Sequence, residues 1–125
     1  MPEAEVRFPR SLFNSESERS LFIEEVCVAV AGALSSRDYN GTMVELKPDE
    51  VDVILSPYEN AAVRAGSIMM VALKGFDYPE RMQNIRDRLK SVAEALTHRV
   101  VARVSVGDRQ PVSVCFIAIQ DGCWV

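Results

Sequence analysis

The chain has 125 residues, of which 48% are hydrophobic and 26% charged, a composition typical of one globular domain rather than of a disordered chain. Its 14 basic and 18 acidic residues give a net charge of −4 without any basic stripe, so nucleic acid is not an expected partner. No apolar stretch approaches a membrane span, and residues 1–10 lack the apolar core of a signal peptide, which predicts a cytoplasmic protein with no membrane partner.

The hydrophobic pattern of the first half predicts a strand, a helix and another strand, with one short extra strand. In chain order these elements are expected at residues 3–8, 16–34, 44–46 and 51–55. The first strand alternates polar and apolar residues, and the helix has one wide apolar stripe. Ser15 or Ser17 is the expected N-cap, because its hydroxyl can accept a hydrogen bond from the first turn. The segment 56–60, which contains Pro57, is expected to close the last of these strands.

The second half predicts the same order of elements. A continuous apolar run after Gly66 is typical of a strand that is covered on both faces. Pro79 is tolerated in the first turn of a second helix. The expected elements are a strand at 67–73, a helix from about 79 to 97, a segment at 100–106 that matches the short strand 44–46, and a last strand at 112–119.

The chain is a duplication through its helical part. At one constant offset, Ile23, Val30 and Leu34 recur as Ile85, Val92 and Leu96. Because such a repeat sets the architecture, 1–125 is predicted to be one α/β (α+β) domain of two βαβ units, approximately 2–62 and 63–125. Four main strands would form one sheet with both helices on one face. The ferredoxin-like fold shares this order of elements, and so do two paired βαβ units related by a pseudo-twofold axis.

Over essentially its whole length the chain resembles the longer members of the tautomerase superfamily, such as the macrophage migration inhibitory factor and malonate semialdehyde decarboxylase families. The resemblance is carried by Met1-Pro2, the helix from Glu16, the strand 51–56 after Pro48, and the ending 114–124 with Asp121 and Trp124. It implies the paired βαβ fold. It also implies a homotrimer, which an open apolar sheet face would favour independently.

Pro2 carries the functional prediction. In the families that the chain resembles, this proline is a general base for keto–enol tautomerisation or, when protonated, an acid in hydration and decarboxylation. Removal of Met1 leaves a secondary amine, whose pKa falls toward neutrality in an apolar pocket among cations. While Met1 remains, the nitrogen of Pro2 belongs to an amide and has no basicity. The expected function is a tautomerase-like enzyme, an isomerase or a related decarboxylase, that acts on a small 2-oxo acid or related carbonyl acid.

The resemblance further implies a cation that holds the substrate carboxylate. The candidate substrate-binding residues are Lys74, Arg81, Arg64 and Arg10, with Tyr58 and Trp124 as pocket walls. Two positions depart from the family: Asp52 replaces an arginine of the second strand, and Lys74 stands where the decarboxylase-like members have an arginine pair. We expect the site at the N-terminal edge of the first strand, where Pro2 meets Lys74, Arg81 or Arg64 and an aromatic ring from Tyr58, Phe76 or Trp124 of the same or a neighbouring subunit.

Two other classes of function stay open. Asp52 and the encoded Met1 favour a non-catalytic oligomeric protein that kept the fold and lost the chemistry. A ferredoxin-like small-ligand-binding domain has the same element order but a different strand order. No Gly-rich phosphate loop, HExxH helix or Ser-His-Asp grouping occurs, so neither a cofactor nor a metal is expected.

The cysteines and the histidine have structural interpretations. Cys27, Cys115 and Cys123 lack metal-binding spacing and are expected to be buried free thiols. His98 is expected to interact with the carbonyl groups at the end of the second helix.

Overall fold

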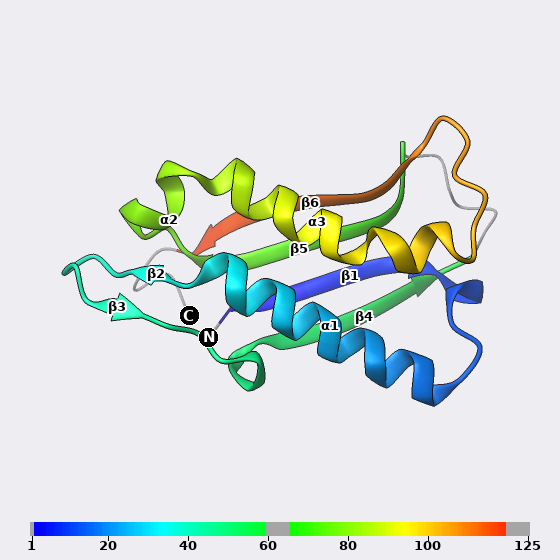
Figure 1. Cartoon of the computed structure of the whole chain (residues 1–125), viewed down its shortest axis with the longest axis horizontal. Coiled ribbons are helices and arrows are strands. Elements are labelled where there is room, and N and C mark those ends of the chain that lie inside the picture. Colours follow the sequence, from blue (N-terminus) through cyan, green and yellow to red (C-terminus); the bar gives the residue numbers. More distant parts are fainter. Residues whose placement is uncertain (1, 60–65, 120–125) are drawn as a thin grey trace.

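The computed structural model describes residues 2–59 and 66–119 (Figure 1). In chain order the strands and helices are β1 Glu3–Pro9, α1 Glu16–Leu34, β2 Ser36–Arg37, β3 Met43–Val44, β4 Asp52–Tyr58, β5 Ser67–Phe76, α2 Pro79–Gln83, α3 Ile85–Val101 and β6 Gln110–Ile119. Two 3-10 turns, η1 Arg10–Leu12 and η2 Pro48–Glu50, follow β1 and precede β4.

The four long strands form one sheet in the order β4-β1-β5-β6. The pairs β1/β4 and β5/β6 are parallel, and the central pair β1/β5 is antiparallel. Each parallel pair is joined through a long helix, and α1 and α3 lie side by side over one face of the sheet (Figure 1). The predicted fold class is therefore confirmed. The ferredoxin-like alternative is wrong, because that fold places another strand between the two strands of a βαβ unit.

The core lies between the sheet and these two helices. In β1 the side chains of Ala4, Val6 and Phe8 are buried, whereas the alternate residues point to the open face. The largest fully buried side chains of the core include Phe8, Leu12, Phe22, Leu34, Ile68, Met69, Leu73 and Leu96. The rings of Phe8 and Phe22 both contact Phe13, at centroid distances of 5.3 and 4.8 Å. This packing accounts for the long apolar stripe of α1.

Helix α1 has the bounds that the sequence predicts, whereas several strand ends differ from the prediction. Ser15 caps α1, since its Oγ accepts the backbone N–H of Glu18 at 3.2 Å. Strand β4 does not stop before Pro57, because β4 is an edge strand in which a residue without an N–H is tolerated. Strand β5 likewise continues past Leu73 to Phe76.

The predicted short strand at 100–106 is wrong. Val100 is fully buried in α3, where it extends the stripe of Val92 and Leu96 at helical spacing. The helix predicted from Pro79 is also interrupted, because Asn84 leaves the helical conformation between α2 and α3. The two halves thus share their β-α-β frame but differ in the connection that precedes the last strand.

The face of the sheet away from the helices mixes charged and apolar side chains. Strands β1 and β4 contribute Glu3, Glu5, Arg7, Asp52 and Ile54 to it, and strands β5 and β6 contribute Met70, Ala72, Lys74, Cys115 and Ile117. A shallow pocket of about 450 Å³ lies on this face between β1, β5 and β6. Cys115 is therefore exposed, which corrects the expectation that it is buried. Cys27 is a half-buried free thiol, and Cys123 lies outside the described residues.

Within residues 2–59 and 66–119, the helices are too short or too polar for any of them to cross a membrane.

Candidate active site

A pocket of about 220 Å³ opens at the N-terminal edge of β1. It is bounded by the beginning of β1, the strand β3, the turn η2, the end of β5 and the helix α2. The described residues that line it are Pro2, Val44, Leu46, Glu50, Gly75, Phe76, Tyr78, Arg81 and Ile119. We refer to it below as the Pro2 pocket.

Pro2 is buried at one wall of this pocket. Its carbonyl accepts the backbone N–H of Asp52 at 3.0 Å. Pro2 directly precedes Glu3, the first residue of β1, which is the pairing partner of Asp52 in β4. The parallel pairing of β1 with β4 therefore fixes the position of Pro2 through its backbone. Met1 lies outside the described residues.

Arg81 supplies the positive charge of the Pro2 pocket. It is 3% exposed, and burial lowers the pKa of its guanidinium. Its Nε and Nη2 donate to the carbonyl of Leu34 at 2.9 and 2.6 Å, and its Nη1 donates to the carbonyl of Phe76 at 2.8 Å. The guanidinium carbon lies 4.7 Å from the ring centroid of Tyr78. A guanidinium has five N–H groups, so one on each terminal nitrogen remains without a bonding partner among the described residues.

Gly75 makes room for this guanidinium. A Cβ atom at that position would lie 3.1 Å from Nη1 of Arg81 and 3.6 Å from the ring of Phe116. This close approach explains why a residue without a side chain stands near the end of β5.

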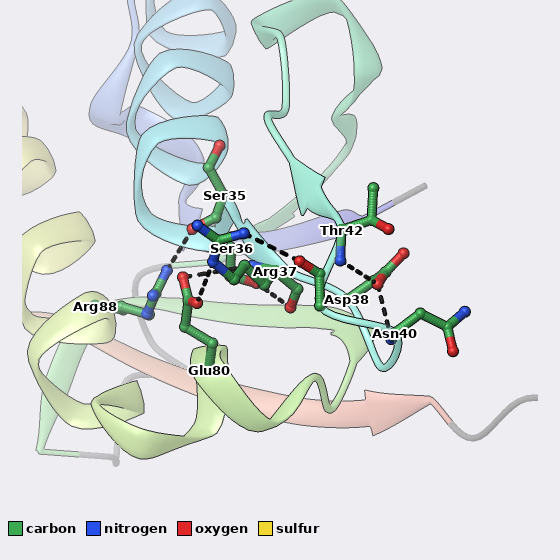
Figure 2. Close-up of polar contacts among 9 residues, drawn as sticks. Ser35, Ser36, Arg37, Asp38, Asn40, Thr42, Glu80 and Arg88 are labelled. Atoms are coloured by element: carbon green, nitrogen blue, oxygen red, sulfur yellow. Dashed lines mark hydrogen bonds and ion pairs between the residues drawn. The ribbon is translucent and has the colours of Figure 1, made fainter.

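The end of α1 is tied to the segments that frame the Pro2 pocket (Figure 2). Arg88 donates to the carbonyls of Ala33 and Ser35 at 2.8 and 2.7 Å, which satisfies groups that a helix C-terminus leaves unpaired. Arg37 of β2 pairs with Glu80 of α2 at 3.4 Å. These contacts hold α2, and hence Arg81, against the end of α1.

The hairpin between β2 and β3 is closed by Asp38. One carboxylate oxygen of Asp38 accepts the backbone N–H groups of Asn40 and Thr42 at 2.9 and 3.0 Å (Figure 2). This turn carries Tyr39, whose hydroxyl donates to Asp77; that hydrogen bond is the main cause that raises the pKa of Tyr39.

Next to the Pro2 pocket lies a second hollow of about 160 Å³, here called the hairpin pocket. It is lined by Asp38, Tyr39, Asn40, Phe76 and Tyr78. Phe76 and Tyr78 line both hollows and therefore form their common wall. The ring of Tyr78 lies 5.0 Å from that of Tyr39 and 5.8 Å from that of Phe76. Aromatic rings thus separate the amine position from the tip of the hairpin.

The structure brings some of the predicted site residues together and separates others. Pro2, Arg81 and Phe76 line one pocket. Lys74 is the neighbour of Gly75 along β5 and so faces the other side of the sheet, where it pairs with Glu3 at 3.6 Å. It is not among the residues that line the Pro2 pocket.

Arg10 and Tyr58 lie at the opposite end of the sheet from Pro2. Strand β1 has seven residues, so its ends are roughly 20 Å apart. Arg10 pairs with Glu59 at 2.8 Å, and the hydroxyl of Tyr58 donates to the carbonyl of Ile68. Within one chain neither residue reaches the Pro2 pocket. Arg64 and Trp124, and also Asp121, lie outside the described residues.

Among the lining residues that the sequence interpretation missed, Glu50 and Tyr78 are the ones with polar side-chain groups. Glu50 ends the turn η2, and its Oε1 accepts the backbone N–H of Lys47 at 3.1 Å. Its place near Pro2 could have been predicted from the sequence, because a residue just before β4 must lie beside the start of the parallel strand β1. Asp52, at the position of the family's arginine, is exposed and contacts Pro2 through its backbone N–H.

His98 takes no part in this site. It lies in the last turn of α3, where Nδ1 is 3.1 Å from the carbonyl of Ala95 and Nε2 is 3.4 Å from a carboxylate oxygen of Glu25. In the part of the chain that the structure describes, no group of three or more His, Cys, Asp or Glu side chains is arranged to hold a metal ion.

The fold is that of the tautomerase superfamily, as the sequence resemblance predicted. Among solved structures, the chain is similar to the wild-type asymmetric trimer of F6 fused 4-OT, with 10% identity over 94% of this chain and 85% of that chain and a TM-score of 0.65. It is also similar to a macrophage migration inhibitory factor-like protein from Entamoeba histolytica, with 8% identity over 99% and 93% of the two chains and a TM-score of 0.63. MIF2 of Leishmania major gives 12% identity over 99% and 93% and a TM-score of 0.61. No protein-family model and no curated protein matches the sequence. At these identities the similarity establishes the fold.

Proposed function

We propose that this protein is a tautomerase-like enzyme that acts on a small 2-oxo acid, with the amine of Pro2 as its general base. The observation that carries the proposal is that Pro2 and Arg81 line the same pocket, next to an aromatic wall. A base needs an apolar wall to keep its amine neutral and a cation to hold an anionic substrate, and this pocket offers both.

The chemistry follows from the groups present. The unpartnered N–H groups of Arg81 hold the substrate carboxylate, and its fork of donors orients the plane of the acid. The neutral amine of Pro2 takes a proton from the carbon next to the ketone, and the carbonyl oxygen takes a proton from solvent to give the enol, after which the prolinium releases its proton to solvent. In the reverse direction the amine, protonated from solvent, gives its proton to that carbon and solvent takes the proton of the enol hydroxyl, which leaves the amine neutral again. No atom is gained or lost in either direction.

The proposal is tested by the conversion of enol-phenylpyruvate to its keto form, followed in the ultraviolet. The protein should be prepared from native cells, and mass spectrometry should establish that Met1 has been removed. We expect a rate well above that of buffer, and a rate equal to that of buffer with a free Pro2 amine would refute the proposal.

A non-catalytic protein with an inherited fold is the second candidate. It is favoured by the role of Arg81 at the end of α1, because capping the carbonyl of Leu34 would by itself explain the burial of this cation. Asp52, which stands where the resemblance implies an arginine, also favours a non-catalytic protein. The phenylpyruvate assay separates the two candidates.

We further propose that the chain forms a homotrimer through the open face of its sheet. Exposed apolar residues on that face, such as Ile54 of β4 and Ile117 of β6, support burial against another copy, and the fused 4-OT proteins with this fold are described as trimers. Sedimentation should give about three times the chain mass. Ile117→Asp, which places a charge on the exposed face of β6, should shift the protein to smaller species.

Leu21→Asp is the matched control for this experiment, because Leu21 is about as exposed as Ile117, at 53% against 47%, but lies on α1. It should sediment like the original protein. A monomer in the original protein, or the same sedimentation for both variants, would contradict the proposed interface.

A further inference from the structure

The charges around the two adjoining pockets are unequal. Among the described residues that line the Pro2 pocket and the hairpin pocket, Arg81 is the one cation, whereas Glu50 and Asp38 are carboxylates. Asp77 stands beside the same rim through its hydrogen bond with Tyr39. Among the described residues, a ligand in the Pro2 pocket therefore meets the cation of Arg81 and the carboxylate of Glu50, and Asp38 and Asp77 add negative charge beyond the aromatic wall.

We infer that the site selects monocarboxylic 2-oxo acids with an uncharged tail, and that Glu50 is the residue that rejects a second carboxylate. This inference rests on the proposed function, because it assumes that the Pro2 pocket holds the substrate. It adds the substrate class and a specificity-determining residue to that function.

The first step of the argument is the capacity of Arg81. Three of its five N–H groups are used by the carbonyls of Leu34 and Phe76, which leaves one on each terminal nitrogen. Two such donors can bind the two oxygens of one carboxylate. They cannot also serve a second acid group at the other end of a substrate.

The second step concerns the rest of the wall. Beyond Arg81 a substrate tail meets Phe76, Tyr78 and Ile119, or the carboxylate of Glu50. An anionic tail would lose its hydration without gaining a partner, and beside Glu50 it would also be repelled. A methyl, methylene or aromatic tail would instead bury its surface against the rings. The wall thus favours an uncharged tail.

The third step is that Glu50 is held in place. Its Oε1 accepts the N–H of Lys47 at 3.1 Å, so the side chain closes η2 while it is half-buried at the pocket. No ion pair between Glu50 and a cation occurs among the described residues. Its charge is therefore not cancelled locally. Gln at this position would keep an oxygen for Lys47 and remove the charge, which makes Glu50→Gln a conservative test.

The experiment measures equilibrium binding to the full chain with Met1 removed, by calorimetry or ligand-observed NMR. The probes are 2-oxopentanoate and 2-oxopentanedioate, which have the same carbon chain and differ in a terminal methyl or carboxylate. We expect the monoacid to bind at least about tenfold more tightly than the diacid. In Glu50→Gln the diacid should bind about tenfold better, while the affinity for the monoacid changes less than about twofold.

Asp49→Asn is the matched control. Asp49 is the exposed neighbour of Glu50 in η2, and its substitution changes the net charge equally. It should leave the preference for the monoacid intact, because exposed charges are screened.

Equal binding of both acids, binding of neither, or a preference that Asp49→Asn removes as fully as Glu50→Gln would overturn the inference. Its failure is distinguishable from failure of the proposed function. Turnover of phenylpyruvate with equal binding of the two acids rejects the substrate class and leaves the catalytic role of Pro2 standing. Selective binding of the monoacid without turnover of phenylpyruvate rejects the catalytic role of Pro2 and leaves the substrate class standing.

Discussion

Pro2→Ala should lower kcat/KM for enol-phenylpyruvate by about 100-fold or more, the usual range for the loss of a positioned general acid or base. In the proposed mechanism the proline ring fixes the direction of the amine, and the apolar wall that includes Phe76 keeps it neutral. The primary amine of alanine lacks the ring and keeps more freedom, so it is a poorer base at this position. The measurement is the initial rate under subsaturating substrate, with thermal unfolding recorded for both proteins.

A second form of the protein separates the contribution of the amine from that of the ring. When an uncleaved residue precedes Pro2, the ring still fills the wall of the pocket but its nitrogen is an amide. This form should be as inactive as Pro2→Ala, and it should fold with the same midpoint as the original. If either protein kept more than a third of the original kcat/KM, Pro2 would not be the base.

Arg81→Leu should destabilise the folded protein by about 2–6 kcal/mol, since it removes the donor of one buried and one half-buried carbonyl group at about 1–3 kcal/mol each. These are the carbonyls of Leu34, at the end of α1, and of Phe76, at the end of β5. The loss is a large part of the 5–15 kcal/mol that stabilises an ordinary domain. Urea denaturation followed by circular dichroism measures it.

Two further variants show whether Arg81 is structural, functional or both. Arg86→Leu removes an exposed arginine from the first turn of α3 and should change stability by less than about 0.5 kcal/mol. Arg81→Lys keeps the charge but not the fork, so it should regain part of the stability while KM for phenylpyruvate stays raised. An unfolding midpoint for Arg81→Leu equal to that for Arg86→Leu would contradict the capping role.

The candidate site was only partly predictable. Pro2 and Arg81 emerged from the sequence because a terminal amine and a nearby cation are the chemistry that the family resemblance requires. Lys74 was an equal candidate on the same grounds, and only the alternation of β5 places it on the opposite face from Gly75. Glu50 could have been placed near Pro2 from its position just before a strand parallel to β1, whereas Tyr78 is brought there by the turn into α2, whose direction no local pattern encodes.

By itself the sequence determined the two βαβ units, because hydrophobic period, capping residues and the repeat are local properties of the chain. The sequence predicted that β4 ends before Pro57, but the strand continues through it. A proline fits a strand only where that strand is at the edge of the sheet, and the position of β4 in the sheet is a tertiary property. Tertiary structure likewise decided that Val100 continues α3, where burial outweighs its strand propensity, and that Cys115 faces outward. It also decided the charge balance of the pocket, because Arg81 and Glu50 meet Pro2 through long-range packing that follows from the parallel pairing of β1 and β4 and the docking of α2 on α1.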